Sequence, residues 1–538
     1  MANQQAAVRP MHDQSDSLPY GQLLVILTSL ILSQFITLVD QNGISITLPT
    51  IASDLNTQNT ISWAGTSSLI GNTMFSMLYG RLSDIFGRKK VYLFVLAVLC
   101  GADLLCAFSQ DAAMFYIGRG LAGTAGGGIM SLSVIIVSDI IPLEYQGKYQ
   151  GILGAFLGLS NLLGPFIAAG FTTKLTWRGF FWLIGPLALC SLMMGYFILR
   201  DTIPDHEDGP WESLKMIDYL GIITSSTGVV FLLLPISGGG SYFEWSSPMI
   251  ITMLAIGSCA LVAFVFVEWK LSRMPMLPVE CLKNKVIATI FLQSFMFGAA
   301  YQSYLYYLPL FYQNVRGWSP IISAALTAPM VTGQSIGSIV SGQYITRRQR
   351  YGEVIWVGFG IWTVGSGLTV LYNRTIHPGA IIVVGGIVGV GVGFVFQPTL
   401  LAAQAHCRKA QRAAVISSRN FFRCLGGACG LAASAAILQR SLRSSLPTKY
   451  LHISDSTYSR PLKSDFPQSD WGLITEAYMK ASRGVFILQV PLVGICFIAC
   501  LLIRDRGMNK AHLDREERPS AGQSREQHTA ATKEKALR

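Results

Sequence analysis

The sequence predicts an all-α polytopic membrane protein, and three observations support this prediction. Of the 538 residues, 51% are hydrophobic and only 13% are charged, whereas soluble domains carry about 25% charged residues. The charges collect between apolar runs of about 20 residues, the length that a helix needs to cross a hydrocarbon core of about 30 Å. The 53 glycines fit the same class, because small residues let membrane helices approach one another closely.

Fourteen apolar segments follow one another along the chain. They cover residues 22–43, 61–80, 91–109, 114–138, 149–171, 179–199, 217–237, 248–268, 286–312, 321–344, 354–372, 379–401, 413–438 and 484–503. Because the number is even, both ends of the chain lie on the same side of the membrane. Lys and Arg concentrate in the short loops of that side, a bias that is typical of the cytoplasmic face.

Two connectors divide these segments into repeated halves. Both contain acidic residues, and they flank the seventh and eighth segments, at 201–218 and 270–285. Without that pair of segments, six remain on each side, as expected for two repeated six-helix halves. The predicted parts are a cytoplasmic tail at 1–20, an N-terminal six-helix bundle at 21–200, a connector with two additional membrane helices at 201–285, a C-terminal six-helix bundle at 286–503 with a long outer loop at 440–483, and a disordered cytoplasmic tail at 504–538.

The loop at residues 80–90 (GRLSDIFGRKK) carries the most specific pattern in the chain. Its three consecutive cations at 88–90 hold such a short loop on the cytoplasmic side, so an orientation signal alone is one interpretation. That interpretation leaves Asp84 unexplained, together with Gly80 and Gly87 on either side of it. We therefore predict that this loop has a mechanistic role beyond orientation.

In the N-terminal six-helix bundle, three ionisable residues fall inside apolar segments, where each costs at least about 2.5–3.5 kcal/mol. Asp40 lies in the outer half of the first segment. Burial favours the neutral form of a carboxyl group, whereas a nearby cation favours the charged form. It is therefore either a switchable proton-binding group or a permanent structural partner of an arginine. Arg119 either pairs with Asp40 across the outer half of the bundle or extends its guanidinium to the membrane surface. Asp103 is either a second titrating group or a polar residue that reaches the interface.

Other polar residues in the C-terminal half are candidates for substrate contacts. Their alternative role is packing or, for the tyrosines, an interfacial belt. The candidates are Gln293, Tyr301 and Tyr304 of the ninth segment, Gln397 of the twelfth and Arg423 of the thirteenth.

Several classes of site find no support in the sequence. There is no metal-ligand or redox spacing and no Walker-type phosphate loop, so we expect no metal, no cofactor and no use of ATP. The net charge of +12 does not indicate nucleic acid, because no basic stripe is interleaved with aromatic residues. The lipid bilayer, with its acidic inner leaflet, is the expected partner. The sequon at Asn373, in a short outer loop, is a possible glycosylation site.

Four elements occur in order along the fourteen segments: Asp40 with the Leu-Pro pair at 48–49, the loop at 80–90, Arg119 with the glycines that follow it, and Gly164-Pro165. Together they resemble the fourteen-span drug/proton antiporter branch of the major facilitator superfamily, particularly its fungal efflux transporters. The resemblance implies the major facilitator fold, with two six-helix halves and two extra central helices.

The resemblance also implies roles for individual residues. Asp40 would couple transport to protons with Arg119 as its partner, and Gly164-Pro165 matches the antiporter motif of the fifth span. A gating loop with a charge relay that locks one conformation would comprise Gly80, Asp84, Gly87, Arg88, Lys89 and Asp139.

The sequence departs from this family pattern at three places. Ala168 and Ala169 stand where the antiporter motif continues with two glycines, which weakens the inference of export. Tyr145 follows Glu144 where the family commonly has Arg, and Asp103 replaces an expected small polar residue.

The predicted function is therefore proton-coupled secondary transport, not catalysis. We expect a monomer that exports a small organic molecule, such as a drug, toxin or secondary metabolite, by alternating access and contributes to multidrug resistance. We expect it in the plasma membrane in preference to the vacuolar membrane. Two alternatives stay open: a vacuolar basic amino-acid or siderophore transporter of the same fold and, more distantly, a membrane-embedded enzyme.

Overall fold

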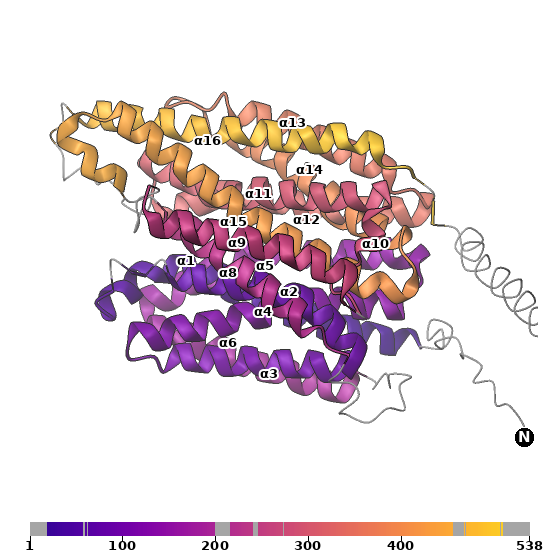
Figure 1. Ribbon diagram of the computed structural model, residues 1–538. Helices are drawn as coiled ribbons and strands as arrows, with labels where there is room; N and C mark the ends of the chain where they lie inside the picture. Colours follow the sequence, from indigo (N-terminus) through magenta and orange to yellow (C-terminus); the bar gives the residue numbers. More distant parts are fainter. Residues whose placement is uncertain are drawn as a thin grey trace, which may run out of the picture.

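The computed structural model describes residues 19–57, 60–61, 63–199, 216–239, 246–272, 274–455, 467, 470–505 and 507–508 (Figure 1). Within these residues, fourteen helices have 18 residues or more, and each overlaps one of the predicted apolar segments. They are α1 (Tyr20–Asp54), α2 (Trp63–Phe86), α3 (Arg88–Ala107), α4 (Ala112–Ile140), α5 (Leu143–Lys174), α6 (Trp177–Ile198), α8 (Tyr219–Gly238), α9 (Pro248–Lys270), α11 (Lys285–Asn314), α12 (Pro320–Arg348), α13 (Gly352–Thr369), α14 (Pro378–Ala405), α15 (Arg412–Ser445) and α16 (Trp471–Ala499). The shorter elements are α10 (Val279–Leu282), η2 (Lys409–Gln411), η3 (Thr448–Asp455) and η5 (Cys500–Leu502).

Eleven of the described helices are long and apolar enough to cross a membrane, by length and composition. The helices α2, α12 and α13 do not reach that level of apolarity. In α2 and α12 the reason is a set of buried polar side chains, such as Thr73 and Ser76 in α2 and Gln334 and Ser341 in α12. Such side chains face other helices and not lipid. The eleven apolar helices confirm the prediction of an all-α polytopic membrane protein. The count of fourteen spans stays a prediction.

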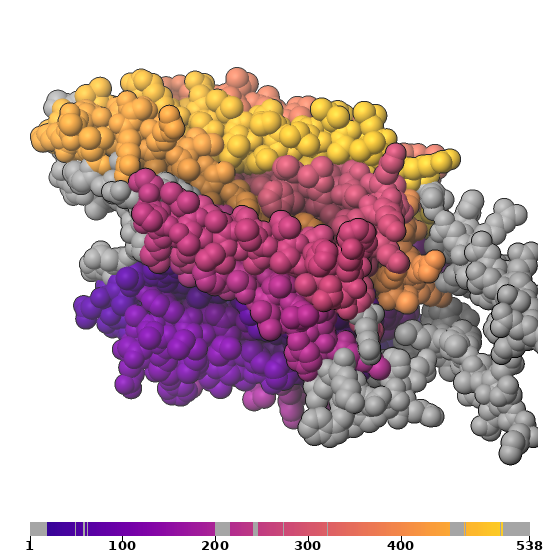
Figure 2. All heavy atoms as spheres, in the orientation of Figure 1, coloured from indigo at the N-terminus to yellow at the C-terminus, as the bar shows by residue number. Residues whose placement is uncertain are grey.

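The helices form two halves that meet along two pairs of helices. The first half, α1–α6, lies below the second half, α11–α16, in Figure 1. They meet where α2 packs on α15 and where α5 packs on α12. The extra helices α8 and α9 pack on each other, and α8 also rests on α2 and α15. On the face shown in Figure 2, the magenta atoms of α8 and α9 cover the line where the halves meet.

The halves are in close contact near one end of the bundle. The start of α1 and the end of α16 lie at this end, on the right of Figure 1, so we call it the termini end. There the glycines of α5 face the backbone of α12: a Cβ atom at Gly147 would lie 2.9 Å from the carbonyl oxygen of Gly342, and one at Gly151 would lie 2.6 Å from that of Ser338. Only residues without a side chain permit this approach of two helices.

Several helices are longer than the predicted apolar segments. The helix α1 continues to Asp54, where the segment ends at residue 43, and α16 begins at Trp471, where the segment begins at residue 484. Hydropathy marks the lipid-crossing part of a helix, but the helix continues while its side chains stay buried, as Ile51 and Tyr478 do. The predicted outer loop at 440–483 is therefore helical at both of its ends. Residues 1–18, 201–215 and 509–538 of the predicted tails and first connector lie outside the described residues.

Candidate functional site

An ion pair lies in the interior of the first half. A guanidinium nitrogen of Arg119, on α4, is 2.6 Å from the Oδ1 atom of Asp40, on α1, and the side chains are 1% and 0% exposed. The ring of Phe181 on α6 lies 5.9 Å from the same guanidinium. The Nε atom of Arg119 and the Oδ2 atom of Asp40 have no hydrogen-bond partner among the described residues. The structure thus brings together the two residues that the sequence singled out for proton coupling.

A second carboxyl group lies beside this pair. Asp103, on α3, is fully buried, and its charged neighbours are Asp40 and Arg119. Neither of its oxygens has a hydrogen-bond donor among the described residues. The cluster therefore contains two carboxyl groups and one guanidinium group in a water-poor environment. If both carboxyl groups are ionised, one negative charge lacks a partner, whereas a single proton on either group lets that group donate a hydrogen bond to the other.

Small residues hold the helices of this cluster in position. Arg119 begins a glycine-rich stretch of α4, and a Cβ atom at Gly118 would lie 2.7 Å from the Sγ atom of Cys106 on α3. A Cβ atom at Gly127 would lie 2.6 Å from the carbonyl oxygen of Asn72 on α2. Close packing of α4 on its neighbours explains why the sequence places glycines directly after the buried arginine.

The predicted antiporter motif packs on α1 immediately beside Asp40. A Cβ atom at Gly164 of α5 would lie 3.1 Å from the carbonyl oxygen of Val39. One turn further along α5, Ala168 replaces the family's glycine. The residue opposite it on α1 is Gly43, where a Cβ atom would lie 3.1 Å from the Cβ atom of Ala168. The glycine at this contact is therefore on α1 and not on α5. Pro165 lies inside α5, as predicted. The close approach of α1 and α5 is preserved despite the departure from the motif.

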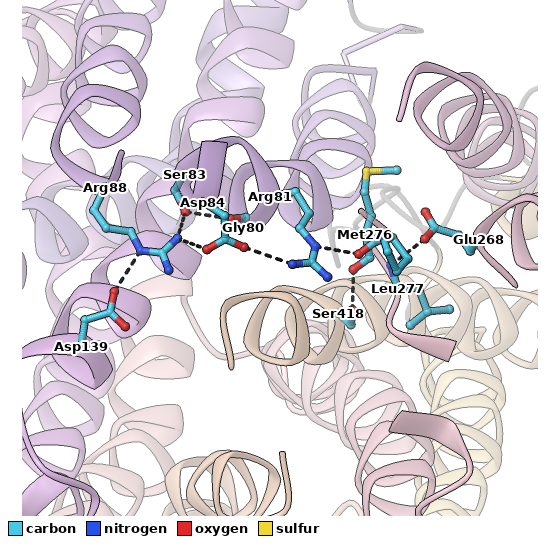
Figure 3. Close-up of polar contacts among 11 residues, drawn as sticks. Gly80, Arg81, Ser83, Asp84, Arg88, Asp139, Glu268, Met276, Leu277 and Ser418 are labelled. Carbon is cyan, nitrogen blue, oxygen red and sulfur yellow. Dashed lines mark hydrogen bonds and ion pairs between the residues drawn. The ribbon is translucent and has the colours of Figure 1, made fainter. Parts of the chain in front are cut away.

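The predicted loop at 80–90 is largely helical, because α2 ends at Phe86 and α3 begins at Arg88, with Gly87 alone between them. Its charged side chains form a set of ion pairs at the termini end (Figure 3), and a gating role for them stays a prediction. Arg88 contacts two carboxylates, with its Nε atom 2.9 Å from Asp139 on α4 and another guanidinium nitrogen 2.6 Å from Asp84. Arg81 contacts the other oxygen of Asp84 at 3.2 Å. Gly87, which precedes α3, has a φ of 93°, a left-handed conformation that residues with side chains rarely adopt. This turn lets Asp84 and Arg88 face each other across the loop.

Two further residues of the loop contact neighbouring helices. Gly80 touches Ser417 on α15, and a Cβ atom at Gly80 would also lie 3.0 Å from the carbonyl oxygen of Ala413. The Nζ atom of Lys89 lies 5.3 Å above the ring of Tyr196 on α6. The loop is therefore held against both halves of the molecule.

Part of the second connector also contacts this relay, which the sequence did not predict. We call residues 274–284, between α9 and α11, the strap. Arg81 donates a hydrogen bond to the carbonyl oxygen of Pro275 (2.6 Å), and Ser418 on α15 donates one to that of Met276 (3.4 Å). The next residue, Leu277, donates its N–H to buried Glu268 on α9 at 3.2 Å (Figure 3). An acidic residue at the end of the eighth apolar segment was the one signal for Glu268.

A chain of polar side chains crosses between the halves near the middle of the bundle. Asn42 on α1 donates to Asn161 on α5 at 2.9 Å, and Asn161 donates to the hydroxyl oxygen of Tyr301 on α11 at 3.1 Å. Tyr301 in turn donates to Gln334 on α12 at 2.6 Å. Gln397 on α14 also reaches this interface, because its Cγ atom lies 3.0 Å from the Cβ position of Gly154 on α5. Tyr301 and Gln397 thus lie where the halves meet, and their contact with a substrate stays a prediction.

Two other predicted cavity residues lie within the second half. Gln293 donates to the carbonyl oxygen of Cys496 on α16 at 2.9 Å, and the hydroxyl of Tyr304 is 3.1 Å from that of Thr369 on α13. Both side chains therefore pack between helices of one half and not between the halves. Asn373 is exposed between α13 and α14, where its Oδ1 atom accepts a hydrogen bond from the N–H of Thr375 at 2.9 Å.

Arg423 lies on α15 close to another arginine, Arg419. Its guanidinium is 5.7 Å from the ring centre of Phe396, and that of Arg419 is 5.2 Å from the same ring. Arg419 is 4% exposed and donates to the carbonyl oxygen of Phe396 (2.5 Å) and to the hydroxyl of Thr399 (3.0 Å). Arg423 donates from two nitrogens to the side-chain oxygen of Asn420, at 3.1 and 3.2 Å. No group of three or more metal-ligating side chains gathers in the part of the chain that the structure describes.

A membrane bundle of two six-helix halves, with ionisable side chains between its helices, is the architecture of secondary transporters. The chain belongs to the Major Facilitator Superfamily, whose family model matches residues 30–431. The chain is 45% identical to Citrate exporter 1 of Yarrowia lipolytica over 93% of this chain and 74% of that protein. It is 39% identical to the MFS-type transporter clz4 of Cochliobolus lunatus over 96% of this chain and 93% of that protein. These findings confirm the family that the sequence motifs indicated.

More distant proteins agree with this assignment. The efflux pump dotC of Dothistroma septosporum is 28% identical, over 80% of this chain and 73% of the pump. Among solved structures, the proton:xylose symporter XylE has the same fold, with a TM-score of 0.57, 13% identity and coverage of 91% of this chain and 97% of that one. The human organic anion transporter MFSD10 gives a TM-score of 0.56 at 14% identity, over 88% of this chain and all of that one. At these identities the likeness concerns the fold alone.

Proposed function

We propose that the protein is a proton-coupled exporter of a small organic molecule that works by alternating access. The observation that carries this proposal is the buried cluster of Asp40, Arg119 and Asp103. It holds two carboxyl groups and one guanidinium group, so its net charge changes between zero and minus one when it binds or releases a single proton. A buried group whose charge changes in this way is the element that a proton-driven cycle requires.

The coupling step follows from electrostatics. A proton that binds Asp40 weakens its attraction to Arg119, which lies 2.6 Å away on another helix. The helices α1 and α4 are then free to move relative to each other, and release of the proton restores the ion pair. Asp103 is the neighbouring group that can hold or pass on the proton within the same cluster.

The relay and the strap form the gate in this proposal. The salt bridges of Arg88 join α2, α3 and α4, and the strap connects Arg81 to α15 of the other half. Together they hold the termini end closed, so that the transport route opens at the opposite end. Opening at the termini end requires that these contacts break.

The names of two relatives bear on the substrate and on the direction of transport. Citrate exporter 1 is named for an organic carboxylate, whereas dotC is named as an efflux pump. A small organic anion is the class that the two arginines Arg419 and Arg423 on α15 favour. In the alternative functions, with a basic amino acid or a siderophore as the substrate, Asp103 would be an additional carboxylate of the substrate cavity. Asp103 lies beside Arg119, inside one half, which favours a role in proton binding over recognition of a cation.

We also propose a monomer with both termini in the cytosol, residues 440–483 on the outer side, and the plasma membrane as its location. The termini end carries the basic relay loop, and such loops resist translocation. A reporter fused to the C-terminus should be accessible only after the cell membrane is permeabilised. Labelling of that reporter in intact cells would reverse the orientation.

Transport by the purified protein tests the proposal. Proteoliposomes loaded with labelled citrate, as a representative organic anion, are diluted into buffer of lower, equal or higher pH. An exchanger should release citrate fastest when protons flow into the lumen down their gradient, and a protonophore should remove that acceleration. Release that does not depend on the pH gradient, at a fixed membrane potential, would contradict proton coupling.

A further inference from the structure

The second half contains two membrane-embedded arginines, and no acidic residue in the described part of the chain forms an ion pair with either of them. Arg419 and Arg423 are four residues apart on α15, so their side chains emerge from the same face of the helix. Both guanidinium groups lie over the ring of Phe396, and they are close enough to repel each other. The described residues place no carboxylate within 4.0 Å of either group.

Uncompensated cations in a membrane protein need an explanation, because buried charges are normally paired. The hydrogen-bond partners of these arginines are a carbonyl oxygen, a hydroxyl and an amide oxygen, all of them neutral. The Nε atom of Arg419 has no partner at all among the described residues, although the residue is only 4% exposed. The first half shows the contrasting case, since Arg119 is paired with Asp40. The arginines on α15 therefore have both unused charge and unused hydrogen-bonding capacity.

The position of Arg423 is where the halves meet. Its neighbour Asn420 donates to the hydroxyl of Ser131 on α4 at 3.0 Å, and Cys424 donates to Asn72 on α2 at 3.2 Å. Arg423 is also within electrostatic reach of Tyr301, which belongs to the polar chain that crosses between the halves. A molecule bound at Arg423 is thus in reach of both halves, as alternating access requires.

Accordingly, we infer that Arg423 and Arg419, with Phe396 beneath them, form an anion site for a small organic polycarboxylate. This inference rests on the proposed transport function and names its substrate class. Arg423 supplies a planar fork that matches a carboxylate in two hydrogen bonds, and it is the less buried of the two. Arg419 supplies the second positive charge. The two charges together favour an anion with at least two carboxylate groups over a monocarboxylate or a cation.

Binding to the purified full-length protein tests the site independently of transport. The probes are citrate and triethyl citrate, which share a carbon skeleton but differ in charge, measured by calorimetry at pH 7. Citrate should bind the unmodified protein and triethyl citrate should not. Arg423→Gln should weaken citrate binding about 10- to 100-fold, as expected for the loss of charged hydrogen bonds. Arg440→Gln, which removes an exposed arginine from the same helix, is the matched control and should leave binding unchanged.

Two further variants separate the possible outcomes. Arg423→Lys keeps the positive charge but lacks the planar guanidinium that makes two hydrogen bonds with a carboxylate. Its affinity for citrate should therefore lie between those of the unmodified protein and Arg423→Gln. This variant also provides the test if Arg423→Gln does not fold. Asp40→Asn should retain citrate binding even where proton-driven transport is lost, so the site and the coupling proposal can fail separately. Equal citrate affinity in the unmodified protein and both Arg423 variants, or equal binding of citrate and triethyl citrate, would overturn the anion site.

Discussion

Buried arginine has opposite surroundings in the two halves of this transporter. In the first half, Arg119 contacts Asp40 at 2.6 Å and has Asp103 as a further acidic neighbour. In the second half, Arg419 and Arg423 have only neutral hydrogen-bond partners among the described residues. The first half therefore has an excess of acidic groups that a proton can neutralise. The second has an excess of positive charge that an anion from outside the chain can neutralise.

In the proposed mechanism the first half therefore binds the proton and the second half binds the organic anion. The directions of charge movement are compatible with such an exchange. An anion that leaves the cell and a proton that enters it both carry positive charge inward. An inside-negative membrane potential drives both movements, at about 2.3 kcal/mol per charge for each 100 mV.

Asp40→Asn should abolish the acceleration of export by a pH gradient. The amide keeps the shape of the carboxyl group but cannot take up a proton at physiological pH, so the charge of the cluster no longer changes. Proteoliposomes with a defined pH difference provide the measurement. Asp103→Asn is the matched comparison, because it removes the neighbouring carboxyl group and leaves the 2.6 Å ion pair intact.

The two variants distinguish the roles of the two carboxyl groups. If Asp40 is the essential group, Asp103→Asn should shift the pH dependence of transport and retain part of the acceleration. Full coupling in Asp40→Asn together with its complete loss in Asp103→Asn would assign the proton to Asp103 and leave Asp40 a structural role.

Truncation of an arginine should affect stability differently in the two halves. Arg119→Ala leaves a buried carboxylate without its partner and should lower the free energy of unfolding by about 3–5 kcal/mol. Arg423→Gln removes an unpaired charge and should change it little, or raise it slightly. Thermal unfolding of both variants in the same detergent, without substrate, provides the measurement. Similar losses of stability would show that the two environments are energetically alike, contrary to the comparison drawn here.

The sequence was sufficient to predict the fold class and to identify the buried charged residues of the first half of the molecule. A charged residue inside an apolar run is conspicuous, so Asp40 and Arg119 could be identified, and the glycines that pack their helices lie beside them in the chain. The second half was harder to interpret. Arg419 and Arg423 lie near the start of an apolar segment, where an arginine can also reach the membrane surface. Only the structure shows that both stack on Phe396, which comes from another helix.

Polar residues were the least predictable part. Gln293 and Tyr304 are as polar as Gln397 and Tyr301 and, like them, lie inside apolar segments, but hydropathy does not reveal which side of a helix faces the other half. The contacts of Gln293 and Tyr304 with α16 and α13 are made between residues far apart in the chain. The contacts of the strap could not be predicted either. They are made largely by backbone groups, such as the carbonyl oxygens of Pro275 and Met276, which are present in any sequence.

Asp84→Asn should slow transport several-fold while expression and citrate binding stay near normal. The amide cannot form the salt bridges with Arg81 and Arg88, at 3.2 and 2.6 Å, that hold the relay together. Initial transport rates at saturating substrate provide the measurement. The matched control is Glu353→Gln, which breaks the exposed pair with Arg350 in the loop between α12 and α13 of the second half. Equal rates in Asp84→Asn and the unmodified protein would reduce the loop at 80–90 to an orientation signal.

The smallest effects should come from exposed ion pairs, and here the two halves should not differ. In the first half, hydrogen bonds from Arg178 and Trp177 lower the pKa of Asp54 below its usual value. In the second half, hydrogen bonds from Tyr344 and Arg350 do the same for the pKa of Glu353. A lowered pKa stabilises the folded state above the pKa of the unfolded chain, and this stabilisation disappears as the pH falls through the folded value.

Asp54→Asn should therefore cost less than about 1 kcal/mol at pH 7, since solvent screens exposed pairs, and less at pH 3, because the stabilisation falls as the pH approaches the lowered pKa of the folded state. Glu353→Gln should behave alike, with a change near the limit of detection. Thermal unfolding of both variants at pH 7 and pH 3 provides the measurement. If one exposed pair proves much stronger than the other, the contrast between the halves would extend to their surfaces. If both are weak, the contrast belongs to the buried charges alone, where the absence of water makes each unpaired charge costly.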